Sequence, residues 1–68
     1  MPFPELNNRE REILDYLAAG RTNPEAAQRL HLSTKTVANN VSTILNKLQL
    51  TQRSQAIVAA RNVGLGRE

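Results

Sequence analysis

Apolar residues recur at intervals of three and four along nearly the whole chain after position 6, which is the spacing of one face of an α-helix. The alternation of apolar and polar residues that marks a half-buried strand is hard to find. The sequence therefore predicts an all-α fold, a compact four-helix bundle. Its helices are expected at about residues 8–19, 24–31, 34–48 and 53–63.

The first expected helix, 8–19, has clear start and stop signals. Asn7 is its expected N-cap, and Glu10 follows three residues later, as in a capping box. Gly20 is placed to end the helix in the left-handed conformation. Its apolar stripe is expected to contain Ile13, Leu14 and Leu17, with Ala18 beside it, and Leu6 is expected to be the staple residue before the cap.

The second expected helix, 24–31, is short. Thr22 or Asn23 can cap it, and Pro24 at its first position costs no hydrogen bond, because an amide there has no partner inside the helix. Its inner face is expected to contain Ala26, Ala27 and Leu30. The two alanines would let the backbone of another helix approach closely.

The third expected helix, 34–48, is the longest. Ser33 is its expected N-cap, and the brief turn before it contains His31, a residue type that tolerates a positive φ better than most. Its apolar face is expected to contain Val37, Val41, Ile44, Leu45 and Leu48. The opposite face is polar but almost uncharged: Lys35, Thr36, Ala38, Asn39, Ser42, Thr43 and Asn46.

The fourth expected helix, 53–63, follows the cap candidates Thr51 and Gln52 and is expected to end before Gly64. Its inward residues are expected to be Ala56, Ile57, Ala60 and Val63. Pro2 and Pro4 favour an extended start. The expected organisation is a linker or leader at 1–5, one domain at 6–65 and a tail at 66–68.

Composition narrows the class of protein. A chain of 68 residues holds one domain, and without cysteine its core must be made by packing alone. No apolar run approaches the roughly 20 residues that span a bilayer, and the first residues lack the pattern of an export signal. The sequence therefore predicts a soluble protein that is not exported and has no membrane partner.

Charge is distributed unevenly along the chain. Residues 1–26 carry three basic and five acidic side chains, a net charge of −2. Residues 27–68 carry six basic side chains and one acidic one, a net charge of +5. A basic surplus of this kind suits a polyanion, although arginines scattered over a solvated surface give the same count.

Two helices joined by a short turn, with Ser, Thr, Asn and Lys at the start of the second, form the geometry that places a recognition helix in the major groove. The pattern alone leaves open whether these side chains read DNA or only solvate a surface helix. An enzyme is not expected, since no nucleophile is paired with a base. His31 is the only histidine and there is no cysteine, so neither a metal nor another cofactor is expected.

Four blocks of sequence carry a resemblance to a known family. They are residues 6–14 (LNNREREIL), 22–30 (TNPEAAQRL), 32–37 (LSTKTV) and 45–48 (LNKL), followed by Arg53, Ser54 and Ala56. In this order and spacing the chain resembles the LuxR-type (GerE-type) helix-turn-helix DNA-binding domain, as in the effector domain of NarL/FixJ-like response regulators. The resemblance covers about residues 6–65.

The resemblance implies that the third helix enters the major groove of double-stranded DNA. The positions implied to face bases are Ala38, Asn39 and Ser42. The positions implied to lie near phosphates are Asn23, Lys35, Thr36, Asn40 and Lys47. The fourth helix is implied to form a weak homodimer contact through Gln55, Val58, Ala59 and Asn62.

The function implied by the resemblance is sequence-specific DNA binding, as a dimer, by the output domain of a bacterial transcription regulator of the two-component response-regulator type. It would act in the cytoplasm, with RNA polymerase as a further candidate partner and without a small-molecule ligand in this domain. Family members often carry Lys or Arg where this chain has Ala38, Ser42 and Asn46, and often His at Asn40. These departures predict weak binding by a single domain, and they keep open an alternative, a helical protein-interaction module that has lost DNA binding.

Overall fold

Four helices appear in the computed structural model, which describes residues 3–67. Their bounds are Asn8–Ala18 for α1, Asn23–Leu30 for α2, Thr34–Lys47 for α3 and Arg53–Asn62 for α4. Residues 3–67 contain no strand. The all-α, four-helix prediction is confirmed. Each helix ends one residue before its predicted end, because that residue adopts the geometry of a C-cap, and α2 also begins one residue early.

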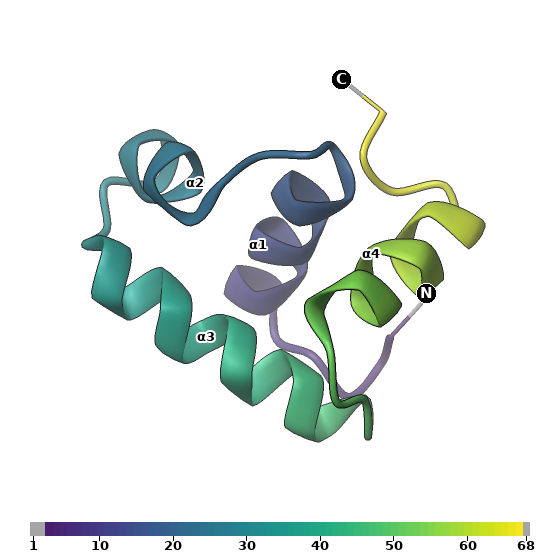
Figure 1. The fold of residues 1–68 in the computed structure, drawn as a ribbon. Coiled ribbons are helices and arrows are strands. Elements are labelled where there is room, and N and C mark those ends of the chain that lie inside the picture. Colours follow the sequence, from purple (N-terminus) through teal and green to yellow (C-terminus); the bar gives the residue numbers. More distant parts are fainter. Residues whose placement is uncertain (1–2, 68) are drawn as a thin grey trace.

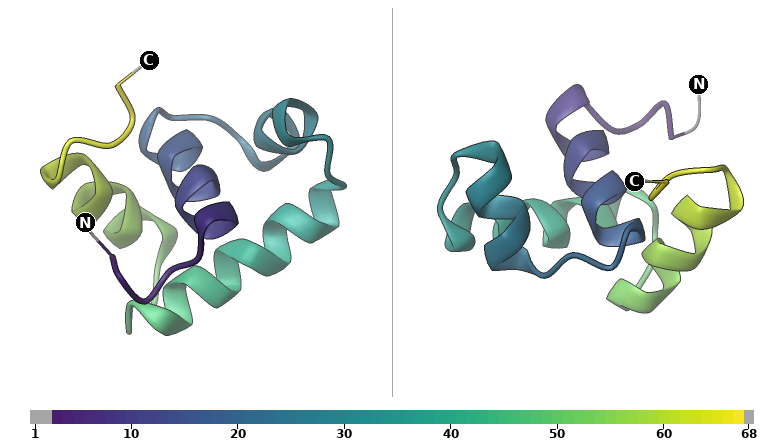
Figure 2. Two further views of the ribbon diagram at one scale, coloured as in Figure 1. Left: turned by 180° about the vertical axis from the view of Figure 1, so that it is seen from behind. Right: turned by 90° about the horizontal axis from the view of Figure 1, so that it is seen from above.

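Helix α1 lies between the other elements and contacts all three of the other helices (Figure 1). Helix α3 runs the length of one side of the domain, α2 packs on its amino-terminal half, and α4 lies on the other side of α1 (Figure 2). Helices α2 and α4 do not pack against each other. The long α3 therefore has one side against the core and one side free.

The core is built from the apolar stripes that the sequence predicts. Ile13, Leu14 and Leu17 of α1 and Val37 and Ile44 of α3 are its largest fully buried side chains. The other buried apolar residues are Leu6, Ala18, Ala26, Ala27, Val41, Ala56 and Ala60. Leu30, Leu45, Leu48 and Ile57, which were also expected to face inward, are partly buried at the edge of this cluster.

Val63 does not point inward, and that prediction is wrong. Helix α4 ends at Asn62, and Gly64 then turns the chain with a φ of 93°. Val63 is left 49% exposed, whereas Leu65 packs on the core after the turn.

The amino-terminal residues differ from the extended start that the prolines predict. Phe3 has a φ of 56°, and its carbonyl accepts a hydrogen bond of 3.1 Å from the Leu6 amide. Phe3 packs against the core, where burial of its ring stabilises the turn. The extended prediction is wrong for residues 3–5, while Pro2 lies outside the described residues.

The carboxy-terminal residues close the end of α1. Arg61 Nε donates to the Ala18 carbonyl at 2.7 Å, and the Gly66 amide donates to Asp15 Oδ1 at 2.7 Å. A Cβ atom at residue 66 would lie only 2.6 Å from the Ala18 carbonyl carbon, so the approach requires glycine. Gly66, which falls in the expected tail, thus contacts α1; Glu68 lies outside the described residues.

An ion pair joins the start of α1 to the end of α3. Lys47 Nζ donates to Glu10 Oε1 at 2.8 Å, and the same carboxylate accepts from the Asn7 amide at 2.9 Å. Asn7 Oδ1 accepts in return from the Glu10 amide at 2.8 Å, so the predicted capping box is confirmed. Glu10 is only 3% exposed, and a carboxylate so buried needs the lysine as its counter-charge.

Burial of Glu10 acts to raise the pKa of its carboxyl group. The hydrogen bonds from Lys47 and from the Asn7 amide, with the charge of Lys47, lower it by more, and the pKa lies below its ordinary value of 4.5. A carboxyl group whose pKa is lower in the folded state contributes stability above its unfolded pKa. That contribution is lost as the pH falls through the folded pKa.

Replacing Lys47 should therefore destabilise the domain in a pH-dependent way. Lys47→Ala should lower the free energy of unfolding at pH 7 by about 1–3 kcal/mol, because it leaves a buried carboxylate without a charged partner. The deficit should shrink below about pH 4.5, as Glu10 is protonated. Urea unfolding followed by circular dichroism, at pH 7 and at a pH below about 4.5, measures the deficit. The exposed neighbour provides a control, Asn46→Ala, which should change stability by no more than about 0.5 kcal/mol. An equal deficit for Lys47→Ala at both pH values would contradict the role of the pair.

Candidate nucleic-acid interface

Helices α2 and α3 are joined by a turn of three residues, as the sequence predicts. His31 ends α2 in the left-handed conformation with a φ of 57°, and the Leu32 amide donates to the Ala27 carbonyl at 2.9 Å. Ser33 then caps α3, because its Oγ accepts from the Thr36 amide at 3.0 Å. The arrangement is a helix-turn-helix in which α3 is the second helix.

Small side chains lie where the two helices pack together. Ala26 and Ala27 of α2 are buried, and Val37 at the first turn of α3 is fully buried in the same cluster. Because alanine allows close approach of backbones, α2 supports α3 from behind without covering its outer face.

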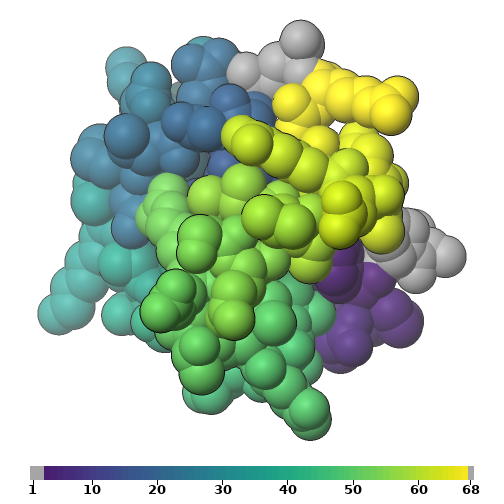
Figure 3. Space-filling view, turned by 45° about the vertical axis from the view of Figure 1, so that its right-hand side comes forward, coloured from purple at the N-terminus to yellow at the C-terminus, as the bar shows by residue number. Residues whose placement is uncertain are grey.

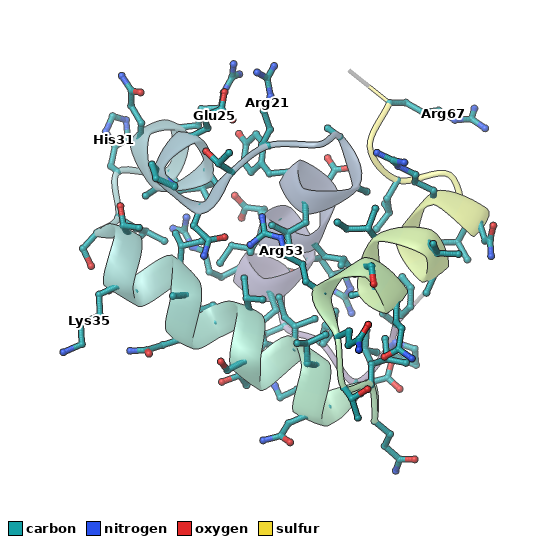
Figure 4. The ribbon with its side chains drawn as sticks, in the orientation of Figure 1. Arg21, Glu25, His31, Lys35, Arg53 and Arg67 are labelled. Carbon is teal, nitrogen blue, oxygen red and sulfur yellow. The ribbon has the colours of Figure 1, made fainter. Side chains whose placement is uncertain are left out.

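The outer face of α3 is exposed and polar. Lys35, Thr36, Asn39 and Ser42 are exposed, whereas Ala38 and Asn40 are half-buried at its edges. Lys35, Asn39 and Ser42 are four and three residues apart, and Thr36, Ala38 and Asn40 lie beside them, so the six positions form one stripe along the helix. Lys35 extends away from the domain at the amino-terminal end of this stripe (Figure 4).

Some polar side chains of this stripe are held in place by the helix itself. Asn40 Nδ2 donates to the Thr36 carbonyl at 2.9 Å, and Ser33 Oγ donates to Thr36 Oγ1 at 2.8 Å. Asn39 and Ser42 have no side-chain hydrogen bond to any residue between 3 and 67. Their donors and acceptors are therefore available to a ligand.

Lys47 and Asn23 have internal partners that the sequence did not reveal. Lys47 lies at the last turn of α3 with 37% of its side chain exposed, and its ammonium group is paired with Glu10. Asn23 is the first residue of α2, and its Oδ1 accepts a hydrogen bond from the guanidinium of Arg53, the first residue of α4. The sequence marked Arg53 only as part of the resemblance and gave it no role.

The four residues of the expected dimer contact lie together on the outer face of α4. Gln55, Val58, Ala59 and Asn62 line one shallow depression with Leu50 and Ser54, and Val58 is 58% exposed. Figure 3 shows this part of the chain, in green to yellow-green, across the front of the domain. The depression is mostly apolar and is uncovered within the described chain.

Residues 3–67 contain neither a metal-binding cluster nor a membrane-spanning helix. No cluster of three His, Asp or Glu side chains is arranged to hold a metal ion. The helices of that segment are also too short and too polar to cross a membrane.

The family model for bacterial regulatory proteins of the luxR family matches residues 4–60. The chain belongs to the LuxR family. The resemblance predicted from the sequence is thereby confirmed, and the match spans all of α1, α2 and α3 and most of α4.

Two of three similar relatives have names that describe regulators. The LuxR-family chain is 42% identical over 60 residues to the transcriptional regulatory protein LiaR of Bacillus subtilis, and 46% identical over 58 residues to the response regulator protein VraR of Staphylococcus aureus. The alignments cover 88% and 85% of this chain but 28% of each relative. It is also 41% identical over 61 residues to the spore germination protein GerE of Bacillus subtilis, covering 90% of this chain and 82% of GerE.

LuxR-family membership assigns the chain to DNA-binding transcription regulation and not to an enzyme family. The chain spans little more than a quarter of the length of LiaR and VraR, and it corresponds to most of GerE. The helix-turn-helix and its exposed polar stripe are the features of this chain that suit that role.

The turn between α2 and α3 provides a direct test of the helix-turn-helix geometry. A left-handed residue other than glycine is strained, so His31→Gly should raise the free energy of unfolding by up to about 1 kcal/mol. His31→Val should lower it by about 1 kcal/mol, because a branched Cβ tolerates positive φ poorly. Thermal and urea unfolding measure both. A valine variant as stable as the glycine variant would show that residue 31 does not adopt this conformation.

Proposed function

We propose that this domain binds double-stranded DNA sequence-specifically, with α3 in the major groove, as the output domain of a bacterial transcription regulator. The observation that carries the proposal is the exposed polar stripe of α3, held outward by the buried Val37 and Ile44 on the opposite side of the helix. A helix presented in this way fits the width of the major groove. The regulator would be of the two-component response-regulator type, like the relative named a response regulator.

Base recognition in this proposal comes from the middle of the stripe. Asn39 can form a pair of hydrogen bonds with adenine, and its amide has no partner between residues 3 and 67. Ser42 can donate or accept at a base edge, and the Ala38 methyl can contact the methyl group of thymine. Thus these three residues would read bases, with Asn39 contributing most to specificity.

Phosphate contacts in this proposal surround the stripe. They are expected from Asn23, Lys35, Thr36, Asn40 and Lys47. Lys35 is exposed and makes no ion pair within residues 3–67, so it is the strongest electrostatic contact of the five. Lys47 would share its ammonium group between Glu10 and a phosphate. With so few cations the salt dependence should be shallow, since each neutralised phosphate contributes a slope of about 0.9.

Dimerisation through α4 would increase the affinity of a domain that binds weakly alone. The apolar depression around Val58 supports this proposal, because it places Gln55, Ala59 and Asn62 on one surface that two copies could share. A dimer would bind two half-sites of the operator. Action in the bacterial cytoplasm and contact with RNA polymerase are further parts of the proposal.

A second function, a protein-interaction module without DNA binding, is favoured by one observation. Lys35 is the only charged side chain on the exposed stripe of α3, which is little positive charge for a surface that binds a polyanion.

Selection from a pool of random duplexes at low salt separates the two functions. The DNA-binding proposal expects enrichment of a defined sequence, and the spacing of its half-sites would report the dimer. Failure to retain any duplex at low salt would contradict DNA binding and favour the interaction module.

Two substitutions on the stripe should affect the selected duplex differently. Asn39→Ala should cost about 1–3 kcal/mol of discrimination between the selected duplex and one with a changed base, because the base-reading amide is lost. Lys35→Ala should weaken binding to all duplexes alike and reduce the salt slope by about one unit. Lys35 is preferred here to Lys47, because removal of Lys47 would also leave Glu10 without its counter-charge and destabilise the fold. Fluorescence anisotropy at several salt concentrations measures both effects. If Asn39→Ala left sequence preference unchanged, α3 would not be the reader.

A further inference from the structure

The amino end of α2 has few donors left for an anion. Thr22 Oγ1 accepts from the Glu25 amide at 3.3 Å, and the Thr22 carbonyl accepts from the Ala26 amide at 3.0 Å. Pro24 has no amide hydrogen. Of the first turn, only the backbone N–H of Asn23 and its side-chain amide stay unbonded as donors within residues 3–67.

The side chain of Asn23 is held from a distant part of the chain. Arg53 Nη1 donates to Asn23 Oδ1, and Arg53 Nη2 donates to the Arg21 carbonyl at 3.0 Å. Both contacts lie in an open depression between the α1–α2 loop and the start of α4, with Leu17 and Ile57 among its lining residues. Figure 4 shows Arg53 between these segments.

Arginine determines which end of the Asn23 amide faces outward. A guanidinium group has five N–H donors and no acceptor, so only the oxygen of Asn23 can bond to it. The NH₂ group of Asn23 is then directed away from Arg53, with both donors unused. Because the guanidinium group of Arg53 is held by two hydrogen bonds, it keeps the Asn23 oxygen inward and leaves the Asn23 NH₂ group facing outward as a donor.

The contact also joins two helices that otherwise do not meet. Asn23 is the first residue of α2 and Arg53 the first residue of α4, and these helices do not pack against each other. The side chain of Arg53 is therefore a direct link between the proposed dimer helix and the proposed DNA surface.

We propose that Arg53 is a positioning residue, which orients the Asn23 amide so that its NH₂ group donates to a DNA phosphate at the amino end of α2. This inference rests on the proposed function, since it assigns the geometry of one of its phosphate contacts. The inference predicts that affinity for DNA depends on the NH₂ group of Asn23, and not only on the hydrogen bond between Asn23 and Arg53.

The substitution Asn23→Asp separates these two roles. The carboxylate still accepts from Arg53 and suits the amino end of a helix, so the unfolding temperature should stay the same or rise. The donor is lost and a negative charge faces the phosphate, so affinity for a random-sequence duplex at low salt should fall tenfold or more, on the order of 1.4 kcal/mol. Fluorescence anisotropy measures the affinity and circular dichroism the stability.

A matched control exists at the start of α1. Asn8 is also the first residue of a helix, and its Oδ1 also accepts from an arginine, Arg11 Nη1, at 3.1 Å. Asn8→Asp makes the same change in net charge at a residue that is not among the proposed DNA contacts. It should change affinity less than twofold. Equal losses for Asn8→Asp and Asn23→Asp would mean that only net charge matters, which would overturn the inference.

The action of Arg53 through Asn23 is tested by combining substitutions. Arg53→Lys keeps the charge, but an ammonium group cannot bond Asn23 Oδ1 and the Arg21 carbonyl in the fixed geometry of a guanidinium group. It should therefore lower the affinity for the duplex about threefold to fivefold, or roughly 0.7–1 kcal/mol. In a chain that carries Asn23→Ala, the same change should have no further effect. Additive losses would overturn the positioning role, provided that circular dichroism shows each variant folded. If the parent chain bound no duplex, the proposed function itself would fail; if it bound and Asn23→Asp bound equally well, only this inference would fail.

Discussion

The packing of α3 against α1 is the constraint on which the rest of this domain depends. Ile13, Leu14 and Leu17 of α1 and Val37 and Ile44 of α3 are fully buried together, so the rotation of α3 about its own axis is fixed. Any other rotation would bury polar side chains such as Asn39 and expose the apolar stripe, at a cost of several kcal/mol. The outward direction of the polar stripe is thus a consequence of the core.

Polar contacts between distant parts of the chain also hold this arrangement together. Three of the basic side chains that give residues 27–68 their net positive charge take part in them. Of the six basic side chains in residues 27–68, Lys47 is paired with the buried carboxylate of Glu10. Arg53 and Arg61 donate to amide or carbonyl oxygens, which fixes their positions but leaves their charge intact. Three of the six cations therefore also hold the helices together, and among these three only Lys47 is paired with a carboxylate.

Local signals in the sequence were sufficient to predict the helices. The capping residues Asn7 and Ser33 and the left-handed His31 act over three or four residues, and each was predicted from its own neighbourhood. For α2 the neighbourhood left Thr22 and Asn23 as alternatives, and Thr22 is the cap. The exposed stripe of α3 followed from the same periodicity. Val63 was mispredicted because the end of α4 depends on how the chain after Gly64 returns to α1, which is a tertiary matter.

The polar links could not be predicted because their partners lie far apart in the chain. Glu10 and Lys47 are separated by 37 positions and Asn23 and Arg53 by 30, and no spacing rule connects such residues. Glu10 was correctly expected as a capping residue, but its second role appears only once α1 and α3 are packed. The resemblance implied the positions of the proposed interface, and the structure adds which of these side chains already have a hydrogen-bond partner within the domain.

The presentation of α3 to DNA is tested most directly by nuclear magnetic resonance, with the ¹⁵N-labelled domain titrated with the selected duplex. The account predicts that the largest changes in amide chemical shift fall on Thr36, Asn39 and Ser42 and at Asn23, with little change along the outer face of α4 in the monomeric range. Changes confined to α4, or an unperturbed α3 in the presence of bound duplex, would contradict it.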